Sequence, residues 1–488
     1  MATGAMAAGC TLIPRYERPP APVPDYFPGA APAHPRSPAQ PQSPPAQPVT
    51  QSQSQWQPQP LAADIAARDF IGDERLNRLI ELALANNRDL RIAVLNVEQS
   101  RAQYLITRAA SFPTVQGSGS FTRQYASFGA EIPGFSTIPG LSSSGITSNT
   151  WSASVGITSY ELDLFGHVRS QNAQALEQYF STAEAQRAAR VSLVGQLATQ
   201  YFSWRLAQEQ LQLAHDTLAS VAQSYAVNKA TFDAGQSNEL DLRQAEGQVQ
   251  TAQLNIQTYE RQAAEAVDAL QLLLGAPLPA ELPSARAFGD ASLLAAIPAG
   301  LPSDLVQRRP DILEAEHTLK AANANIGVAR AAFFPTISLT GSDGLSSPQL
   351  SSLFKPGSSE WSFGPQISLP IFTGGKNRAQ LESAHAAERI QVATYEKAIQ
   401  TAFREVADAL VDADSYARQI VTESALIVTQ QRRLELATLR YRQGEDTYLN
   451  MLLAQQDLYS AQQGLLQAQF NRLSSEVALY QALGGGWK

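Results

Sequence analysis

Apolar and small polar residues alternate in several short segments of the chain. In residues 151–158 and 361–369, aromatic and aliphatic residues take every second position, and mainly serine, glycine, glutamine or threonine stand between them. A period of two places the apolar side chains on one face of a β-strand and the polar ones on the other. Residues 336–340 and the more Gly/Ser-rich residues 114–125 alternate similarly. The pattern predicts four strands, at about 113–125, 150–162, 335–345 and 361–370.

Strands with one apolar face and one small, polar face suit two different structures. One is a soluble sandwich with half-buried strands, and the other is a membrane barrel with lipid-facing strands. Four strands are too few to close a barrel across a membrane, which needs about eight. If these strands lie in a membrane, closure of the barrel therefore requires several copies of the chain.

Two segments rich in Ala, Gln, Leu, Glu and Arg, residues 167–232 and 376–441, contain no proline. Because proline is the commonest helix breaker, each segment can form one uninterrupted helix. At 1.5 Å per residue, such a helix would be about 100 Å long. Gly235 and Gly444 follow these segments, where a positive φ would allow the chain to reverse into a further helix.

The helices predicted after these two glycines carry apolar residues every seven positions. The positions are Leu242, Val249, Ile256, Ala263 and Leu270 in the first half, and Leu452, Tyr459, Leu466, Leu473 and Tyr480 in the second. Sustained heptads specify coiled packing of helix on helix. An ordinary soluble bundle or coiled-coil rod would show the same heptads, but it does not explain the strand pairs that interrupt the helices.

The two halves of the chain resemble each other. The sequence Phe-Pro-Thr-Val at residues 112–115 recurs as Phe-Pro-Thr-Ile at 334–337, and Gly235 recurs as Gly444. Each half therefore has the order helix, strand, loop, strand, long helix, turn, long helix. The expected organisation is a signal remnant at 1–10, a Pro-rich linker at 11–63, a first repeat at 64–275, a second linker at 276–303 and a second repeat at 304–488.

Charge and composition exclude several functions. The chain carries 36 Lys and Arg against 44 Asp and Glu, a net charge of −8, without a basic run, so no nucleic-acid partner is expected. Five scattered histidines and one cysteine do not suit a Cys/His metal site, and no metal or cofactor is expected. No 18 consecutive residues are apolar, so the sequence predicts no membrane-spanning α-helix.

The sequence also predicts that the chain is not an enzyme. It contains no G-x-S-x-G, H-E-x-x-H or phosphate-cradling G-x-x-x-x-G-K-[ST] motif. Asp408 and Asp412 lie one helical turn apart beside Glu405, but without a partner motif they are expected to form a solvated wall. His317 and His385, each alone on a helix, are expected to be structural.

The first ten residues, MATGAMAAGC, end in the small-small-Gly-Cys pattern at which bacterial lipoproteins are cut and acylated. Several acyl chains on Cys10 would hold the chain firmly on a membrane, because each buried CH₂ group contributes about 0.8 kcal/mol. The Pro-rich residues 14–60 would then form a slack tether. The alternative is an incidental cysteine in a tail.

From about residue 64 to 488 the chain resembles the TolC-like outer-membrane efflux channels, in particular the OprM-type (NodT) lipoprotein branch. The matching strings are Leu-Pro-Ser-Asp-Leu at 301–305, Arg-Arg-Pro-Asp-Ile at 308–312, Ala-Ala-Phe-Phe-Pro-Thr-Ile at 331–337, Tyr-Arg-Gln-Gly at 441–444, and Tyr-Gln-Ala-Leu-Gly-Gly-Gly-Trp at 480–487.

The resemblance implies an α+β membrane protein. Three copies would form a twelve-stranded outer-membrane β-barrel, with four strands per chain, continued by a long α-helical periplasmic barrel with coiled-coil tips. The implied function is passive conduction of small molecules and drugs across the bacterial outer membrane. The implied partners are a periplasmic adaptor (membrane fusion) protein, an inner-membrane proton-driven efflux transporter and outer-membrane lipid. Type I protein secretion and metal-ion efflux are the alternatives within this class.

The resemblance also implies a pore gate just past the second turn. There the family has an inward leucine and, four residues on, an inward aspartate, which match Leu449 and Leu453. Two leucine rings would close by apolar contact and dewetting, with Asn450, Gln456 and Tyr441 as further gate residues. Tyr441 is expected to hydrogen-bond an acidic group on a neighbouring helix. The competing interpretation is that Leu453 is a core heptad residue.

The two helical turns are the second implied site. In the family, the tips of the helical hairpins meet the periplasmic adaptor. The matching candidates for adaptor contacts are Asp233, Gly235, Arg442 and Gly444. Any antiparallel helical hairpin would also need the two glycines for its turn.

Overall fold

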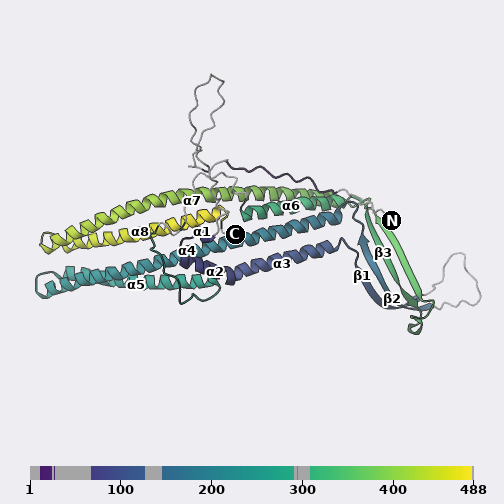
Figure 1. The fold of residues 1–488 in the computed structure, drawn as a ribbon, viewed down its shortest axis with the longest axis horizontal. Coiled ribbons are helices and arrows are strands. Elements are labelled where there is room, and N and C mark those ends of the chain that lie inside the picture. Colours follow the sequence, from purple (N-terminus) through teal and green to yellow (C-terminus); the bar gives the residue numbers. More distant parts are fainter. Residues whose placement is uncertain are drawn as a thin grey trace, which may run out of the picture. The chain divides into compact units, whose positions relative to one another are not determined.

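Four antiparallel strands form one sheet in the order β1-β2-β3-β4 (Figure 1). They are β1 (Val115–Ala126), β2 (Ile146–Glu161), β3 (Thr336–Ser347) and β4 (Ser359–Ser368). The computed structural model describes residues 11–24, 27, 67–126, 146–290, 294 and 308–485. The prediction of four strands per chain is confirmed, and each half of the sequence contributes one pair. In the described part of the chain β1 and β4 are the two edges of the sheet.

The two faces of the sheet differ in chemistry, as the alternation predicts. Phe121 lies opposite Trp151 with ring centroids 4.3 Å apart, on the apolar face. The other face carries hydroxyl pairs whose oxygens lie 2.7–2.9 Å apart: Ser118 with Ser154, Ser120 with Ser152, and Ser342 with Ser362. Adjacent strands therefore place like chemistry side by side on each face.

Eight α-helices account for most of the described chain. They are α1 (Ala67–Phe70), α2 (Glu74–Asn86), α3 (Arg88–Ala109), α4 (His167–Asp233), α5 (Glu239–Leu274), α6 (Pro310–Ala331), α7 (Lys376–Arg442) and α8 (Tyr448–Ala482), with a short 3₁₀ turn at Leu350–Ser352. Both α4 and α7 have 67 residues, so each matches its predicted range to within one residue. None of the helices in the described residues is long and apolar enough to cross a membrane.

The structure divides into two compact units, and each draws on both halves of the sequence. The first comprises residues 1–18, 98–180 and 317–393 and contains the sheet. The second comprises residues 19–97, 181–316 and 394–488 and contains the two helical hairpins, formed by α4 with α5 and by α7 with α8.

Glycines end the long helices as expected. Gly235 has φ 74° and Gly444 has φ 75°, in the left-handed region where residues with a Cβ are disfavoured. At the first turn the amide of Gln236 donates to the carbonyl of Thr231 at 2.8 Å, and at the second that of Glu445 donates to Arg440 at 3.0 Å. These bonds satisfy carbonyls that a helix end leaves open.

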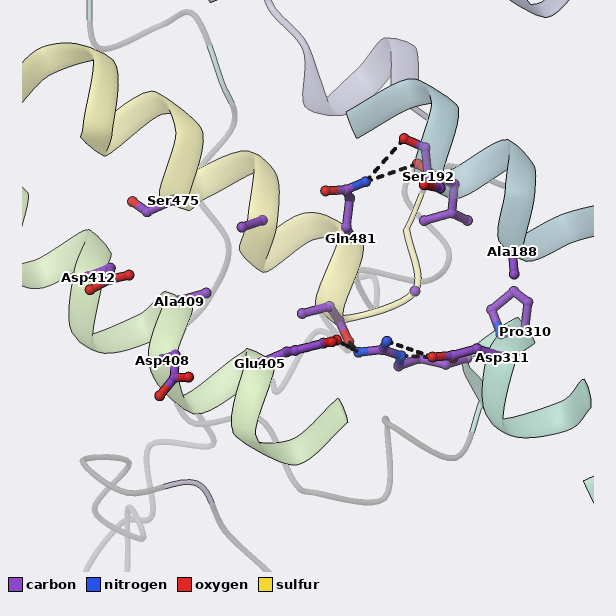
Figure 2. Close-up of a pocket in the computed structure, with 15 residues that line it drawn as sticks. Ala188, Ser192, Pro310, Asp311, Glu405, Asp408, Ala409, Asp412, Ser475 and Gln481 are labelled. Atoms are coloured by element: carbon purple, nitrogen blue, oxygen red, sulfur yellow. Dashed lines mark hydrogen bonds and ion pairs between the residues drawn. The ribbon is translucent and has the colours of Figure 1, made fainter. Parts of the chain in front are cut away.

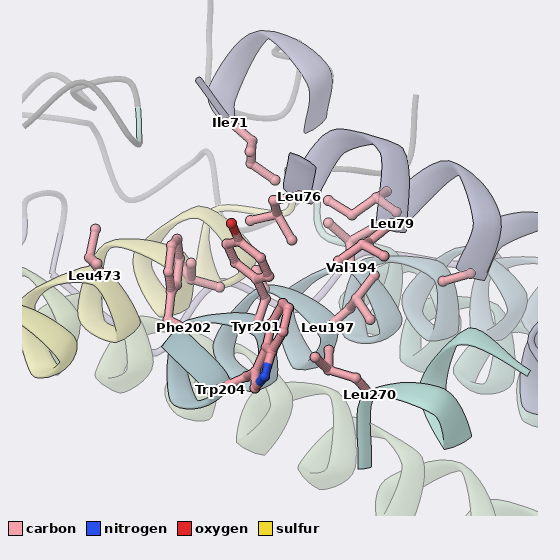
Figure 3. Packing of buried hydrophobic residues seen from close by; sticks show 14 of the residues in the cluster. Ile71, Leu76, Leu79, Val194, Leu197, Tyr201, Phe202, Trp204, Leu270 and Leu473 are labelled. Carbon is pink, nitrogen blue, oxygen red and sulfur yellow. The ribbon is translucent and has the colours of Figure 1, made fainter. Parts of the chain in front are cut away.

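The main hydrophobic cluster lies in the second unit, where α2, α4, α5 and α8 meet (Figure 3). Leu197, Leu270 and Leu76 are fully buried there. Tyr201 is also buried, and its hydroxyl donates to Oδ2 of Asp73 at 2.8 Å. The other carboxylate oxygen of Asp73 accepts the amides of Arg75 and Leu76 and so caps α2. One buried carboxylate therefore joins the start of α2 to the middle of α4.

His317 has its partners on a neighbouring helix, in keeping with the structural role expected of it. Its Nδ1 lies 2.6 Å from Oε2 of Glu177, and its ring centroid lies 5.4 Å from that of Phe180. Both partners belong to α4 within the first unit, so His317 joins α6 to α4. The partner was invisible in the sequence because 140 residues separate the two side chains.

Candidate functional site

The predicted gate residues lie on the first turns of α8, in the second unit. Leu449 is 46% exposed and Leu453 is 41% exposed, and Asn450 and Gln456 are exposed as well. Leu449, Leu453 and Gln456 follow the spacing i, i+4, i+7, so they lie along one face of the helix. This face begins with two apolar side chains and continues with an uncharged polar one.

The opposite side of α8 packs inside the chain. Tyr448, Met451 and Leu452 are buried together with Ala245 of α5. Since α8 already has this buried side, Leu453 is not a core residue of the single chain. Leu449 and Leu453 therefore form a partly exposed apolar surface on α8.

Tyr441, the last predicted gate residue, joins the two hairpins. Its hydroxyl donates to Oδ1 of Asn228 at 2.8 Å, so the partner on the neighbouring helix is an amide and not the expected acidic group. Asn228 is 1% exposed, and its Nδ2 donates to the carbonyl of Ser224 at 3.0 Å. The amide of Asn228 can accept the hydrogen bond from the Tyr441 hydroxyl and at the same time donate one to the helix carbonyl. A carboxylate at this position could only accept hydrogen bonds.

Burial sets the protonation of this pair of tyrosines. Burial raises the pKa of Tyr441, and the charge of Asp241 adds to that effect. Burial also raises the pKa of Tyr448 to about 12. The rings of Tyr441 and Tyr448 pack edge to face with centroids 5.6 Å apart. Tyr441 therefore remains a neutral donor to Asn228 at physiological pH.

The candidate tip residues are exposed at the two turns. Asp233, Gly235, Arg442 and Gly444 all lie on the surface of the chain. Lys229 and Asp233 form an ion pair of 3.2 Å, but both side chains are more than half exposed, so the pair adds little stability. The four residues are therefore available to a partner.

Asp446 organises the second turn, although the sequence analysis missed it. Its Oδ1 accepts the amide of Thr447 at 2.8 Å and Nδ2 of Asn450 at 2.6 Å, and its Oδ2 lies 3.5 Å from Nε of Arg440. The Asn450 and Thr447 bonds lower the pKa of this carboxyl group, and the charge of Arg440 lowers it further. The Asp-Thr pair directly before an apolar helix start was the available signal.

A cavity of about 540 Å³ lies near the C-terminal end of α8, in the second unit (Figure 2). Arg309, from the Arg-Arg-Pro-Asp-Ile string, is its buried cation. Its Nη2 lies 2.7 Å from Oδ2 of Asp311, and its Nη1 lies 2.8 Å from Oε2 of Glu405 and 2.9 Å from the carbonyl oxygen of Ala482. Burial opposes its charge, but Asp311 and Glu405 outweigh burial and raise the pKa of Arg309.

Glu405, which was expected in a solvated wall, keeps 41% of its side chain exposed but also has an ion-pair partner. Glu405 pairs with Arg309, and Asp408 and Asp412 line the same cavity. Because Arg309 directly precedes α6 and contacts Glu405 of α7 and Ala482 of α8, it connects three helices. Within the described residues, no group of three or more His, Cys, Asp or Glu side chains is arranged to hold a metal ion.

The beginning of the described N-terminal segment, at Leu12 and Pro14, is hydrogen-bonded to α6 in the first unit. Nδ2 of Asn323 donates to the carbonyl of Pro14 at 2.9 Å, and Nη1 of Arg330 donates to that of Leu12 at 3.3 Å. Cys10 lies outside the described residues, as do the segments 28–66, 295–307 and 486–488. Most of the Pro-rich linker and the Leu-Pro-Ser-Asp-Leu string therefore have no structural description.

Comparisons with known proteins agree with this geometry. The family model described as "Outer membrane efflux protein" matches residues 79–276 and 301–485. The solvent efflux pump outer membrane protein SrpC of Pseudomonas putida is 46% identical over 484 residues, which cover 99% of this chain and 96% of SrpC. The cation efflux system protein CusC of Escherichia coli is 39% identical over 481 residues, covering 98% and 96% of the two chains.

A solved structure gives the same result for the fold. The open state of the MtrE outer membrane channel of Neisseria gonorrhoeae superposes with a TM-score of 0.82 at 35% identity. The superposition covers 98% of this chain and 99% of MtrE. The sheet and the long helical hairpins are therefore shared across nearly the full length of both chains.

Proposed function

The chain belongs to the outer membrane efflux protein family, and from that membership we propose how it works: three copies form the outer-membrane channel of a tripartite efflux pump. An inner-membrane proton-driven transporter and a periplasmic adaptor deliver small molecules to this channel, which conducts them passively across the outer membrane. Conduction of this kind requires a pore, a closure and a docking surface, and it requires no nucleophile, acid, base or metal.

The observation that carries the proposal is an open sheet with two unlike faces. β1 and β4 are its edges, one face is apolar, and the other presents paired serines. An unpaired strand edge is unfavourable in a bilayer because its backbone groups find no water. Three copies joined edge to edge give twelve strands, which is enough to close a barrel. The apolar face then meets lipid, and the hydroxyl face lines an aqueous lumen.

We place the closure of the pore at Leu449 and Leu453. Their exposed position on α8, opposite the side that packs inside the chain, supports a place at the axis of the trimer. Two stacked rings of three leucines would exclude water and ions by dewetting. Asn450 and Gln456 flank these rings, and Tyr441 holds α7 against α4 just behind them.

The exposed turns at the ends of the helical hairpins are the proposed contact surface for the adaptor. Asp233 and Gly235 at the first turn, and Arg442 and Gly444 at the second, stand at the ends of the helical hairpins. In the assembled pump these turns would meet the adaptor in the periplasm, while the sheet stays in the outer membrane.

A lipid on Cys10 would anchor the chain to the outer membrane in addition to the sheet. Leu12 is held to Arg330, which lies six residues before the first residue of β3. Cys10 stands two residues before Leu12 in the sequence, and two residues of extended chain span about 7 Å. Acyl chains attached there would reach the same membrane that the sheet crosses.

The proposed cargo is small organic molecules, including solvents and drugs. SrpC, the relative with the higher identity reported above, belongs to a solvent efflux pump, whereas the cation efflux relative CusC is less similar. Metal-ion efflux and type I protein secretion are therefore not favoured. The transporter selects the substrate, and the channel only has to admit it.

Complementation of a bacterial strain that lacks its own efflux channels tests the function. The strain would express this chain together with an efflux adaptor and transporter, and minimum inhibitory concentrations of toluene and of several antibiotics would be measured. We expect resistance to rise several-fold with all three components and to stay at the background level when any one is omitted. Resistance unchanged by the full set, with trimers present in the outer membrane, would contradict the proposal.

A further inference from the structure

The two hairpins of the sheet pair their strands in the same register. The Phe-Pro-Thr strings before β1 and β3 start 222 positions apart, and Trp151 of β2 and Trp361 of β4 are 210 positions apart. Moving the β1–β2 pairs by these two distances reproduces the β3–β4 pairs wherever both hairpins are paired. Phe121 opposite Trp151 thus corresponds to Asp343 opposite Trp361. The internal repeat therefore holds for strand pairing as well as for sequence.

The junction between the two hairpins, where β2 pairs with β3, sets one further register. Ala153 lies opposite Leu345 there. If β1 of the next copy of the chain follows β4 as β3 follows β2, the same two distances convert this pair into Phe363 opposite Arg123. The conversion also gives Trp361 opposite Tyr125, Pro365 opposite Phe121, and Ile367 opposite Gly119. All of these residues lie within β4 and β1, so the two strands pair over most of their length.

The backbone groups at the two open edges fit this register. The amide of Ser346 donates to the carbonyl of Ser358 at 2.7 Å, so the even-numbered residues of β3 and β4 direct their backbone groups at each other. Because the direction alternates along a strand, odd-numbered residues face the open edge of β4, and the same alternation carried across β3 and β2 leaves odd-numbered residues at the open edge of β1. Pro365 agrees with this direction, since its missing amide then takes no bond from the β3–β4 pairing. The converted register pairs odd with odd, as hydrogen bonding between the edges requires.

The register also preserves the two faces of the sheet. On the apolar face it joins Phe363 to the row that contains Phe121 and Trp151. On the hydroxyl face it sets Ser362 opposite Gln124, Gly364 opposite Thr122, and Gln366 opposite Ser120. A shift by one residue would turn the serines of one strand toward lipid. A shift by two would keep both faces, so the internal repeat is what selects this register among those that the chemistry allows.

Arg123 gains a partner in this arrangement. It is exposed on the apolar face of β1, where a charged side chain is unfavourable if lipid surrounds it. The register places it opposite Phe363 and diagonal to Trp361 of the neighbouring copy, whose side chains are 65% and 75% exposed in the single chain. A guanidinium group is attracted to the face of an aromatic ring. The next copy would thus bring two rings to a cation on the surface that faces lipid.

We propose that the seam between neighbouring copies repeats the register of β2 with β3, so that Phe363 of one copy lies opposite Arg123 of the next and Ser362 lies opposite Gln124. The inference rests on the proposed function and deepens it, because it specifies which residues join the strand edges of the threefold channel. Every junction in the twelve-stranded barrel then has one of two registers, both of which the single chain already contains.

Pairs of cysteines across the seam test the register on the full-length protein in the outer membrane. Ser362→Cys with Gln124→Cys is the predicted pair, whose Cα atoms would lie about 4.5 Å apart, within the range of a disulfide. Ser362→Cys with Thr122→Cys, and Ser362→Cys with Ala126→Cys, are the matched controls, shifted by two residues in either direction. Their Cα atoms would lie about 7–8 Å apart, which is too far.

The cross-link can form only between copies, because β2 and β3 separate β1 from β4 within one chain. Variants that restore resistance in the complementation assay would be oxidised mildly in isolated outer membranes and separated by denaturing electrophoresis without reductant. The unsubstituted chain, whose only cysteine is Cys10, gives the blank. We expect the predicted pair to give covalent dimers and trimers in several-fold higher yield than either control.

A higher yield from either shifted pair would overturn the register, and so would the absence of cross-links from all three pairs. Both results would leave the proposed function in place, since the variants restore resistance. The opposite combination, a cross-link at the predicted pair in a chain that restores no resistance, would support the register and remove the proposed function instead.

Discussion

Single residues decide how the proposed pore closes. Leu449 and Leu453 are exposed on the chain and uncharged, although the resemblance to TolC-like channels leads one to expect an aspartate at position 453. A carboxylate ring attracts cations and responds to pH, whereas a leucine ring excludes all ions alike. The chain should therefore leak little and show weak ion selectivity when it is closed.

Leu453→Asp should give the channel a selectivity that it lacks. Three carboxylates close to the axis would favour cations at neutral pH. Their mutual repulsion would raise the pKa of the new groups, so selectivity should be present at high pH and be lost as the pH falls. Reversal potentials in a KCl gradient across planar bilayers would measure it, with Leu453→Ile as the control. Cation selectivity in the unsubstituted channel as strong as in Leu453→Asp would place the constriction elsewhere.

Tyr201→Phe should destabilise the second unit by about 1–2 kcal/mol, because the buried Asp73 loses the hydroxyl that donates to it. Burial raises the pKa of Tyr201 from 10.0 to about 12. Unfolding then releases its proton at pH values between these limits, so this contribution to stability is intact below about pH 10 and is lost as the pH approaches 12. Thermal unfolding midpoints from pH 7 to 11 would show a shallower alkaline decline in Tyr201→Phe. An unchanged midpoint and slope would contradict the role of the pair.

At the scale of elements, the two turns of the helical hairpins require a left-handed backbone conformation, in addition to being the proposed docking surfaces. Gly444 has φ 75°, and within the described residues no atom lies within 4 Å of the place that a Cβ would take. The backbone conformation, and not crowding, is therefore the reason for a glycine at this position. Gly247 has equally open space but lies inside α5 with ordinary helical geometry. The two glycines therefore form a matched pair.

Gly444→Ala should cost about 1–2 kcal/mol, because alanine disfavours the left-handed conformation. Gly247→Ala should instead stabilise the chain by about 0.5–1 kcal/mol, since glycine weakens a helix interior. Chemical denaturation followed by circular dichroism would compare the two variants. Equal effects of the same sign would show that the second turn does not need a left-handed residue.

Local patterns predict the elements well, and contacts between distant residues are what they miss. Alternation, heptads and the absence of proline located the strands and placed the ends of α4 and α7 to within one residue. They could not show that Arg309 reaches the carbonyl of Ala482, 173 residues away, or that Tyr441 reaches Asn228. Such pairs depend on how the helices pack, and no periodic signal marks them.

At the scale of the whole molecule, the single chain is incomplete. Its sheet has two open edges, its apolar strand face is exposed, and the leucines proposed as the gate are only half covered. Each of these surfaces has a partner in a threefold assembly in a membrane: an edge of the next sheet, lipid, or the same leucines on two other chains. One threefold assembly would thus cover the strand edges, the apolar face and the leucines, which are otherwise unrelated exposed surfaces.

The mass of the intact particle tests this account most directly. Native mass spectrometry of the protein released from outer-membrane-derived lipid should give three times the mass of one chain, which is 52.6 kDa for the full sequence and changes with processing and lipid attachment at Cys10. We expect this species to dominate and to need detergent or lipid to stay dispersed. A stable monomer that remains dispersed without either would contradict the account, because a four-stranded sheet could not then enclose a pore.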